Sequence, residues 1–227
     1  MKIFAISDTH GFHNQLVIPD DIDMIIHAGD GSNSKSPAIN ANEVIDFLEW
    51  FEKIPNIKYK IFVAGNHETS IEKKLIKKLD ITNRGIIYLH HESVVIENIN
   101  IFGSPYTPFF CDWAFNVQRH KLDQVWEDVP DNTNILITHG PPKYILDLSK
   151  DRDGKLEFCG DKSLLNRVKK LKECKYNIFG HIHDSNECYN KGFRKLEDCN
   201  TTFINASCVT DAKFDKGLTS HGFVIEY

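Results

Sequence analysis

Several features that define other classes of protein are missing from this 227-residue sequence. No apolar run approaches the roughly 20 residues that a helix needs to span a bilayer. The N-terminal stretch lacks the basic region, apolar core and cleavage site of a secretory signal. The six cysteines include no Cys-x-x-Cys pair and are too few for a disulfide framework in this length of chain. We therefore expect an unsecreted, soluble, cytoplasmic protein with reduced thiols and no membrane partner.

An excess of positive charge is also missing. The sequence has 27 Lys and Arg against 32 Asp and Glu, for a formal net charge of -5. This balance argues against nonspecific binding of nucleic acid but is compatible with a small phosphorylated substrate. The sequence has no linker rich in Pro, Gly or Ser and no internal repeat. We expect residues 1–227 to form one domain with a substantial core, and the sequence indicates no oligomeric state.

Hydrophobic periodicity predicts alternating strands and helices. Strands are expected at residues 2–7, 23–28, 58–64, 86–90, 93–97, 99–103, 134–138, 176–179, 201–205 and 222–226. Helices are expected at 41–54, 68–79 and 117–129. A further helix is expected directly after Asp161, with Asp161 as its N-cap. The three short strands between 86 and 103 suit antiparallel pairing in a second sheet. The fold class is therefore α/β, with two facing mixed β-sheets flanked by helices.

Five of the expected strands run into loops that carry Asp, Asn or His. In order, these loops supply Asp8 and His10, then Asp30, then Asn66 and His67, then His139, and finally His181 and His183. Ligands of α/β sheets collect beyond the carboxyl ends of strands, so we expect these side chains to meet. Taken alone, the tripeptide at residues 8–10 is better explained as a polar turn with a solvated histidine. Repetition of the pattern after five strands favours a metal centre.

The polar side chains suit two metal ions. Seven of them are candidate ligands: Asp8, His10, Asp30, Asn66, His139, His181 and His183. One zinc ion uses four ligands at most, so seven donors suffice for two ions. Two cations roughly 3.5–4 Å apart usually share a carboxylate, and Asp30 is the candidate for that bridge. Oxygen and nitrogen donors without thiolate favour manganese, with iron or zinc as alternatives, in divalent or trivalent form.

The motifs also occur in a familiar order. They are Asp8-Thr9-His10, Gly29-Asp30, Gly65-Asn66-His67-Glu68, Thr138-His139-Gly140 and Gly180-His181-Ile182-His183. This order resembles that of the calcineurin-like metallophosphoesterases. Segments 103–106, 109–115, 138–142 and 201–207 extend the resemblance over nearly the whole chain, to the small metallophosphoesterase-domain (MPPED-like) subgroup related to class III cyclic nucleotide phosphodiesterases. The resemblance implies a four-layer α/β/β/α sandwich.

The resemblance also implies roles for individual residues. Asp8, His10, Asp30 and His183 would hold the first ion, and Asp30, Asn66, His139 and His181 the second. A hydroxide bridging the ions would attack the phosphorus in line with the departing oxygen. His67 resembles the family's general acid or phosphate-contacting histidine, and a structural loop histidine is the alternative. In some relatives a non-ligand replaces the residue equivalent to His181, so its presence here favours a competent enzyme.

The expected activity is that of a metal-dependent phosphoric ester hydrolase acting on a small phosphodiester. The subgroup implies a cyclic nucleotide. Gly31-Ser32-Asn33-Ser34 differs from the segment that follows Gly-Asp in protein phosphatases, which argues against that activity. The alternative is a catalytically weak interaction module or scaffold, although a scaffold has no reason to retain every ligand together with His67.

Two segments are left without a defined role. The aromatic residues of 109–115 suit either stacking on a nucleotide base or packing in the core. The loop after His139 is long enough to shape a pocket. No substrate-binding residue is assigned in either segment.

Overall fold

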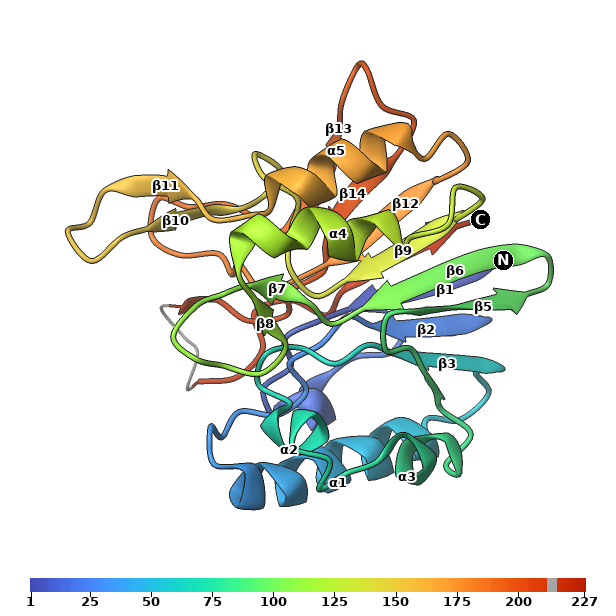
Figure 1. The fold of residues 1–227 in the computed structure, drawn as a ribbon. Helices are drawn as coiled ribbons and strands as arrows, with labels where there is room; N and C mark the ends of the chain where they lie inside the picture. The colour runs from blue at the N-terminus through green and yellow to red at the C-terminus, as the bar shows by residue number, and fades with distance from the viewer. Residues whose placement is uncertain (212–215) are drawn as a thin grey trace.

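The computed structural model describes residues 1–211 and 216–227. Its two main β-sheets lie face to face, with helices on both outer sides (Figure 1). The first sheet has the order β15-β1-β2-β3-β4, formed by Phe223–Glu226, Lys2–Ile6, Met24–His27, Tyr59–Phe62 and Ile87–Tyr88. The second has the order β13-β14-β12-β9-β6-β5, formed by Gly192–Lys195, Thr202–Asn205, Tyr176–Phe179, Ile135–Thr138, Ile99–Ser104 and Glu92–Ile96.

Both sheets are mixed. Strands β1, β2, β3 and β4 run parallel, and β15 pairs antiparallel with β1. In the second sheet β6, β9, β12 and β14 run parallel, and the edge strands β5 and β13 are antiparallel to their neighbours. The predicted class of two facing mixed sheets flanked by helices is therefore confirmed.

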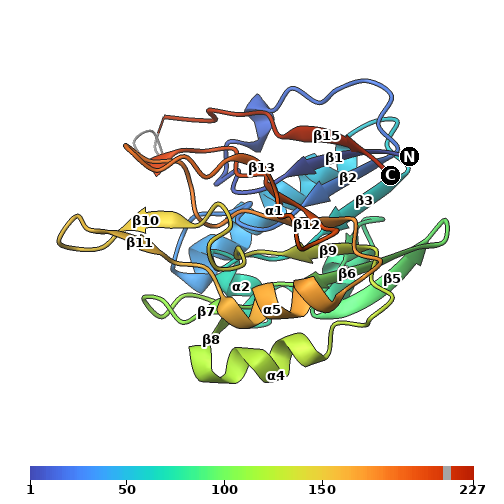
Figure 2. The ribbon, with the colours of Figure 1, turned by 90° about the horizontal axis from the view of Figure 1, so that it is seen from above.

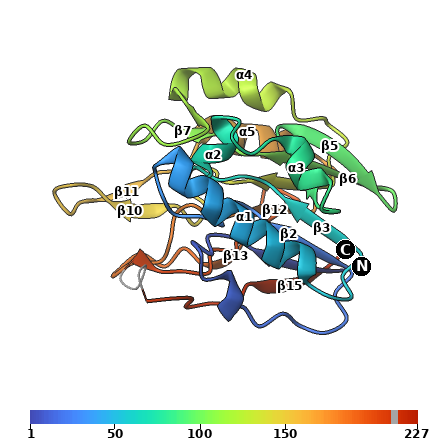
Figure 3. The same cartoon turned by 90° about the horizontal axis from the view of Figure 1, so that it is seen from below.

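Helices form the two outer layers. Helices α1 (Pro37–Lys53), α2 (Thr69–Glu72) and α3 (Lys78–Thr82) cover the first sheet, as the view from below shows (Figure 3). Helices α4 (Leu122–Glu127) and α5 (Lys162–Lys170) cover the second sheet, as the view from above shows (Figure 2). The short segments η1 (His13–Gln15) and η2 (Arg119–Lys121) precede α1 and α4. Within the described residues, no helix is both long and apolar enough to cross a membrane.

Two small pairs of strands lie outside the main sheets. β7 (Thr107–Pro108) pairs with β8 (Asn116–Val117), and β10 (Leu148–Lys150) pairs with β11 (Leu156–Phe158). The β10–β11 hairpin projects away from the sandwich in all three views (Figures 1 to 3). It lies in the stretch after His139, where the sequence predicts a long loop.

The core follows from the alternation of side chains along the strands. Ile26 of the first sheet and Ile137 of the second belong to one cluster between the sheets. Their neighbours Ile25 and Leu136 face the opposite way, into separate clusters under α1 and under α4 and α5. The strands are therefore buried on both faces, as parallel strands between layers must be.

The helix expected over residues 68–79 is wrong as a single element. The chain forms α2, turns, and then forms α3, with Lys74 in the left-handed region at a φ of 59°. The amide of Leu75 donates to the carbonyl of Ser70 at 2.8 Å, which closes the turn. Leu75 and Leu79 are consequently 55% and 65% exposed instead of buried. Apolar spacing cannot reveal such a reversal when both halves keep a helical pattern.

Other boundaries differ for local reasons. Helix α1 begins four residues earlier than expected, because Pro37 is well tolerated at the first helical position. The helix expected over 117–129 is reduced to α4, after β8 and η2. The strand expected at 86–90 pairs parallel with β3 in the first sheet, instead of antiparallel in the second. Strand β13 was not expected, since its edge position leaves three of its four residues exposed.

Candidate metal centre

The polar loops of both sheets meet at one edge of the sandwich. Strands β1, β2 and β3 end there in the first sheet, and β9 and β12 end there in the second. Ser7 bridges to Ser207 just beyond the strands, and its amide donates to the carbonyl of Ala206 at 3.0 Å. This link between the sheets draws the loop after β1 toward the loops of the second sheet.

One group of side chains gathers Asp8, His10 and His183. One donor atom from each lies within 4.8 Å of the others. Oδ1 of Asp8 lies 3.3 Å from Nε2 of His183, and Asp8 is fully buried. The group combines a carboxylate with two imidazoles, a donor set that suits a transition-metal ion.

A second group gathers Asp30, His139 and His181, again with one donor atom from each within 4.8 Å of the others. Oδ2 of Asp30 lies 3.2 Å from Nε2 of His139, and Oδ1 of Asn66 lies 2.9 Å from the same nitrogen. Asp30 therefore faces His139 and His181 while also reaching the other group, since Oδ2 lies 3.9 Å from Nε2 of His10.

His67 lies beside these groups. It shares a third set with His10 and Asp30, and its Nε2 lies 4.0 Å from Oδ2 of Asp30. The structure thus brings the seven expected ligands and His67 to one place. That they bind metal stays a prediction.

Acceptors behind the imidazole rings fix the ring orientations. Nδ1 of His10 lies 3.1 Å from the carbonyl of Ser32, and Nδ1 of His139 lies 2.9 Å from the carbonyl of Ala28. A carbonyl oxygen only accepts, so each Nδ1 carries the hydrogen and each Nε2 faces the site. Such carbonyl or carboxylate partners are the usual support for metal-binding histidines.

Charge is balanced among the buried groups. Burial would raise the pKa of Asp8, but the hydrogen bond and charge of His183 hold it well below its usual value. Burial likewise opposes protonation of His183, yet its bonds to Asp211 and Asp8 raise its pKa to about 10. The pKa of His139 rises to about 9 against its burial, through the charge of Asp30. The carboxylates therefore favour positive charge here, and metal cations can replace these protons.

Two glycines leave space for the donors. A Cβ atom at Gly65 would collide with the carboxylate of Asp30, and one at Gly180 would collide with that of Asp8. Any other residue at these positions would displace a candidate ligand. The donor types and the space kept for them both fit a metal centre.

Four of the candidate ligands have a left-handed backbone. The φ values are 53° for Asp8, 42° for His10, 58° for Asp30 and 68° for His181. Non-glycine residues seldom adopt this region, and strained backbone concentrates at functional sites. Hydrogen bonds hold the conformation: the amides of Asp8 and His10 donate to the carbonyls of Gly29 and Asp30 at 2.8 and 3.0 Å.

Glu68 belongs to the Gly65-Asn66-His67-Glu68 motif, but the sequence indicates no role for it. Glu68 is 1% exposed and accepts hydrogen bonds from the amides of Gly65, Asp30 and Ser32. It therefore binds the loops after β2 and β3 to each other. Burial raises its pKa, and the nearby charge of Asp30 adds to that rise. The only sequence signal was its place directly after Asn66-His67.

Asp211 and His27 were also missed. Oδ1 of Asp211 lies 3.0 Å from Nδ1 of His183, where it orients that ring. His27 is fully buried, and its Nε2 lies 3.0 Å from Oγ1 of Thr9. Asp211 belongs to no motif, and His27 reads as part of an apolar strand, so no local pattern identifies either one.

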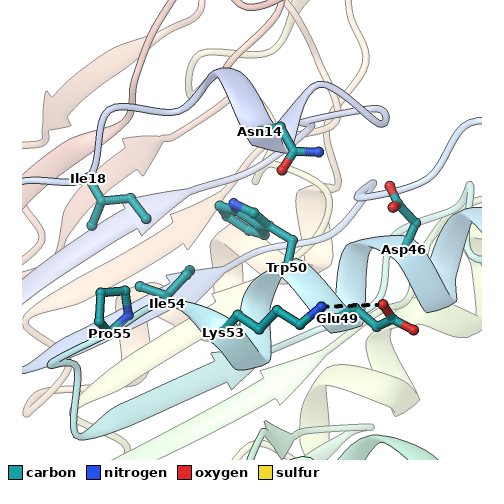
Figure 4. A pocket seen from close by; sticks show the side chains of 8 residues that line it. All are labelled: Asn14, Ile18, Asp46, Glu49, Trp50, Lys53, Ile54 and Pro55. Carbon is teal, nitrogen blue, oxygen red and sulfur yellow. Dashed lines mark ion pairs between the residues drawn. The ribbon is translucent and has the colours of Figure 1, made fainter.

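A separate hollow of about 320 Å³ lies between α1 and the segment around η1 (Figure 4). Trp50 lines it, and Lys53 pairs with Glu49 across 3.6 Å. None of its eight lining residues is a candidate ligand. It brings together no set of donors like that at the sheet edge, so the edge remains the candidate site.

Comparison with known proteins identifies the class. The family described as calcineurin-like phosphoesterase matches residues 1–185. The match covers every candidate ligand, and the chain belongs to this family.

Relatives narrow the class to a subgroup. The chain is 32% identical to "Metallophosphoesterase domain-containing protein 1" of Homo sapiens, over 92% of this chain and 66% of that protein. It is 34% identical to "UPF0046 protein K07C11.7" of Caenorhabditis elegans, over 91% of this chain and 69% of that protein. The chain thus spans about two thirds of the length of these relatives. The expected MPPED-like subgroup is confirmed.

Solved structures support the fold alone. One chain aligns with a TM-score of 0.63 at 17% identity, covering 90% of this chain and 89% of its own length. A "Putative 5'-Nucleotidase from Staphylococcus aureus" aligns with a TM-score of 0.54 at 15% identity, covering 92% of this chain and 48% of its own.

Proposed function

We propose that this protein is a dinuclear metal-dependent phosphodiesterase acting on a small phosphodiester, with a cyclic nucleotide as the expected substrate. Membership of a phosphoesterase family supports the reaction class. The observation that carries the proposal is the position of Asp30, whose carboxylate lies between two groups of Asp and His donors.

In this proposal each ion has four protein ligands. Asp8, His10, Asp30 and His183 would hold the first, and Asp30, Asn66, His139 and His181 the second. Bound cations of this kind stabilise charge on phosphoryl oxygens and make a hydroxide available at neutral pH. The mixed donors suit manganese, iron or zinc.

His67 is proposed as the general acid. Its Nδ1 lies 2.8 Å from the carbonyl of Asn33, so that nitrogen carries a hydrogen and Nε2 is directed to the site. A proton on Nε2 can then pass to the departing ester oxygen. General acid catalysis of this kind contributes about 10²–10⁴ in rate, and most where the leaving group is a poor one.

The test is turnover by chelated and metal-reconstituted protein. We would measure rates on 2′,3′- and 3′,5′-cyclic nucleotides, bis-nitrophenyl phosphate and a simple monoester, with metal content measured by elemental analysis. We expect chelation to abolish activity, manganese to restore it, and two ions per chain. One ion or none after manganese loading would exclude the dinuclear centre, and hydrolysis confined to the monoester would exclude a phosphodiesterase.

The second candidate function is that of an interaction module or scaffold with weak turnover. The left-handed backbone at Asp8 and Asp30 favours the enzyme over the scaffold as the function, because a scaffold gains nothing from strained backbone at these donors. Absence of hydrolysis of every ester in the panel by protein that binds two ions would favour the scaffold. The cytoplasmic location and the single-domain organisation remain predictions.

A further inference from the structure

Trp113 lies directly against His67. It belongs to the loop between β7 and β8, residues 109–115, which we call the aromatic loop. The indole and imidazole rings stack with their centroids 4.1 Å apart and their planes inclined by 29°. Trp113 is half-buried, so this contact places an aromatic plane at the rim of the candidate metal centre.

The imidazole of His67 is held on several sides. Nδ1 bonds to the carbonyl of Asn33, Trp113 covers a face, and the ring of His10 approaches at 4.7 Å with an inclination of 82°. Nε2 then lies 4.0 Å from Oδ2 of Asp30. A histidine ring ordinarily has a broad, two-fold torsion about its last bond, and stacking narrows that torsion.

The aromatic loop is anchored where it meets the site. The amide of Ala114 donates to the carbonyl of Asn66 at 3.1 Å, next to His67 in the chain. The amide of Phe115 donates to Oε1 of Glu72 at 2.8 Å. Ala114 and Phe115 are buried, whereas Phe110 is 59% exposed. The loop is therefore fixed directly after the stacked indole, at its end nearest the site.

The backbone of the aromatic loop is also strained. Cys111, Asp112 and Phe115 have φ values of 50°, 52° and 54°. Left-handed residues persist only where their surroundings hold them in place. The ammonium of Lys35 supplies one such contact: it donates to the carbonyl of Cys111 at 2.8 Å and lies 5.2 Å from the centroid of the Trp113 ring.

We propose that Trp113 is a positioning residue that holds the imidazole of His67 with Nε2 toward the leaving-group oxygen. The inference rests on the proposed function of His67 as general acid. It also gives the aromatic loop a role. Because the indole of Trp113 stacks on His67, we assign Trp113 to support of the proposed general acid and not to stacking on a nucleotide base. A misplacement of about 1 Å can cost on the order of 10² in rate, which is the scale expected here.

The test is a double-mutant cycle read with two substrates. Trp113→Ala should slow hydrolysis of a cyclic nucleotide by about 10- to 100-fold, while bis-nitrophenyl phosphate, whose leaving group needs no proton, is slowed much less. In the His67→Ala background the same substitution should have little further effect, because its partner is gone. Trp113→Phe should restore most of the rate, since it retains a stacking ring. Phe110→Ala is the matched control on the same loop, and its rates should stay near the wild type.

A readout independent of turnover separates this inference from the proposed function. We would record the ring nitrogen resonances of His67 by NMR of ¹⁵N-histidine-labelled protein. Trp113→Ala should shift them and Phe110→Ala should not, even if the wild type hydrolyses no ester in the panel, in which case the proposed function alone fails. Unchanged His67 resonances in Trp113→Ala would overturn the positioning role. Equal slowing of both substrates, or equal slowing with and without His67, would also overturn it.

Discussion

The side chain of Asp30 has a different role from those of the other candidate ligands. Its Oδ2 faces His139 at 3.2 Å and His10 at 3.9 Å, while its Oδ1 accepts the amide of His67 at 2.8 Å. An amide could preserve the bond to His67 but could not neutralise two cations. The charge of Asp30, more than its shape, is therefore expected to maintain the centre.

We predict that Asp30→Asn loses more activity than His10→Ala. A terminal ligand leaves a partial site when it is lost, whereas loss of the bridge affects both ions. Mutation of residues that only support metal ligands typically lowers metal affinity or activity by about 10–100-fold. We therefore expect Asp30→Asn to lower the rate by at least about 100-fold. Rates on bis-nitrophenyl phosphate and metal per chain would be measured on the same preparations. An equal or milder loss for Asp30→Asn would place the bridge elsewhere.

His27 gives the fold a dependence on pH. The amide of Gly29 donates to its Nδ1 at 3.3 Å, so that nitrogen is unprotonated and the ring is neutral. Burial lowers the pKa of His27 from 6.5 to about 3. The unfolded chain takes up this proton near pH 6.5 and the folded protein does not, so the free energy of unfolding falls as the pH drops from 6.5 toward 3.

We predict that His27→Gln flattens this dependence. A glutamine amide can both donate and accept, but it does not titrate. The slope of unfolding free energy against pH should decrease by up to about 1.4 kcal/mol per pH unit. Urea unfolding with chelator present, at several pH values between 4 and 7, measures both slopes. If the two proteins give parallel curves, His27 is not buried in its neutral form.

At the scale of elements, Asp161 connects two helices. Its Oδ1 accepts from the amide of Leu164 at 2.7 Å, which caps α5, and from Nε1 of Trp126 in α4 at 3.0 Å. Trp126 is 1% exposed, so water cannot replace this partner. One carboxylate thus sets the start of α5 and its packing against α4.

Asp161→Ala should lower the free energy of unfolding by about 2–4 kcal/mol, the sum of a lost cap and an unsatisfied buried indole N–H. Asp161→Asn keeps an acceptor and should lose far less. Chemical unfolding of both variants gives the comparison. Hydrolysis well below the melting temperature should match the wild type, and a loss of metal in either variant would show that the effect reaches the centre.

The cap at Asp161 is a feature of this fold that local sequence signals do predict. Its capping role follows from the residues around it, and the structure confirms it. The reversal at Lys74 does not follow from any local signal, because a left-handed lysine is set by the contacts around it. Strand β4 is similar: whether it joins the first or the second sheet depends on neighbours distant in the sequence.

At the scale of the whole molecule, the candidate centre joins the two sheets. Asp8 and Asp30 follow strands of the first sheet, whereas His139 and His183 lie beyond strands of the second. Ions bound by both sets would bind the folded state and not the unfolded chain. Binding of this type stabilises a protein by about 2.7 kcal/mol at a ligand concentration 100 times the dissociation constant.

We therefore predict that chelation lowers the melting temperature and that manganese restores it. The increase in melting temperature should grow with metal concentration. Amides near Asp8 and His181 should exchange hydrogen faster after chelation, since the bond from the His181 amide to Asp8 joins the sheets at 2.9 Å. Asp30→Asn serves as the control and should show a much smaller metal-dependent shift. A melting temperature unaffected by metal would argue that no ion bridges the sheets.

The sequence reveals the candidate ligands because each follows a strand whose pattern is clear. It does not reveal the groups that support them. Asp211 lies 28 positions from His183, and Glu68 acts on the amides of Asp30 and Ser32 in another loop. These roles arise from tertiary contact, so only the folded chain shows them.

The left-handed backbone of His181 bears on how such a chain changes over evolution. At a φ of 68° a non-glycine residue carries a penalty of about 1–2 kcal/mol that glycine does not. The ring of His181 lies 4.9 Å from that of His139 and belongs to none of the three hydrophobic clusters, so its loss removes no side chain from them. A lineage released from selection for turnover would therefore exchange His181 for glycine with little harm to the sandwich. The fold would then outlast the complete set of candidate ligands.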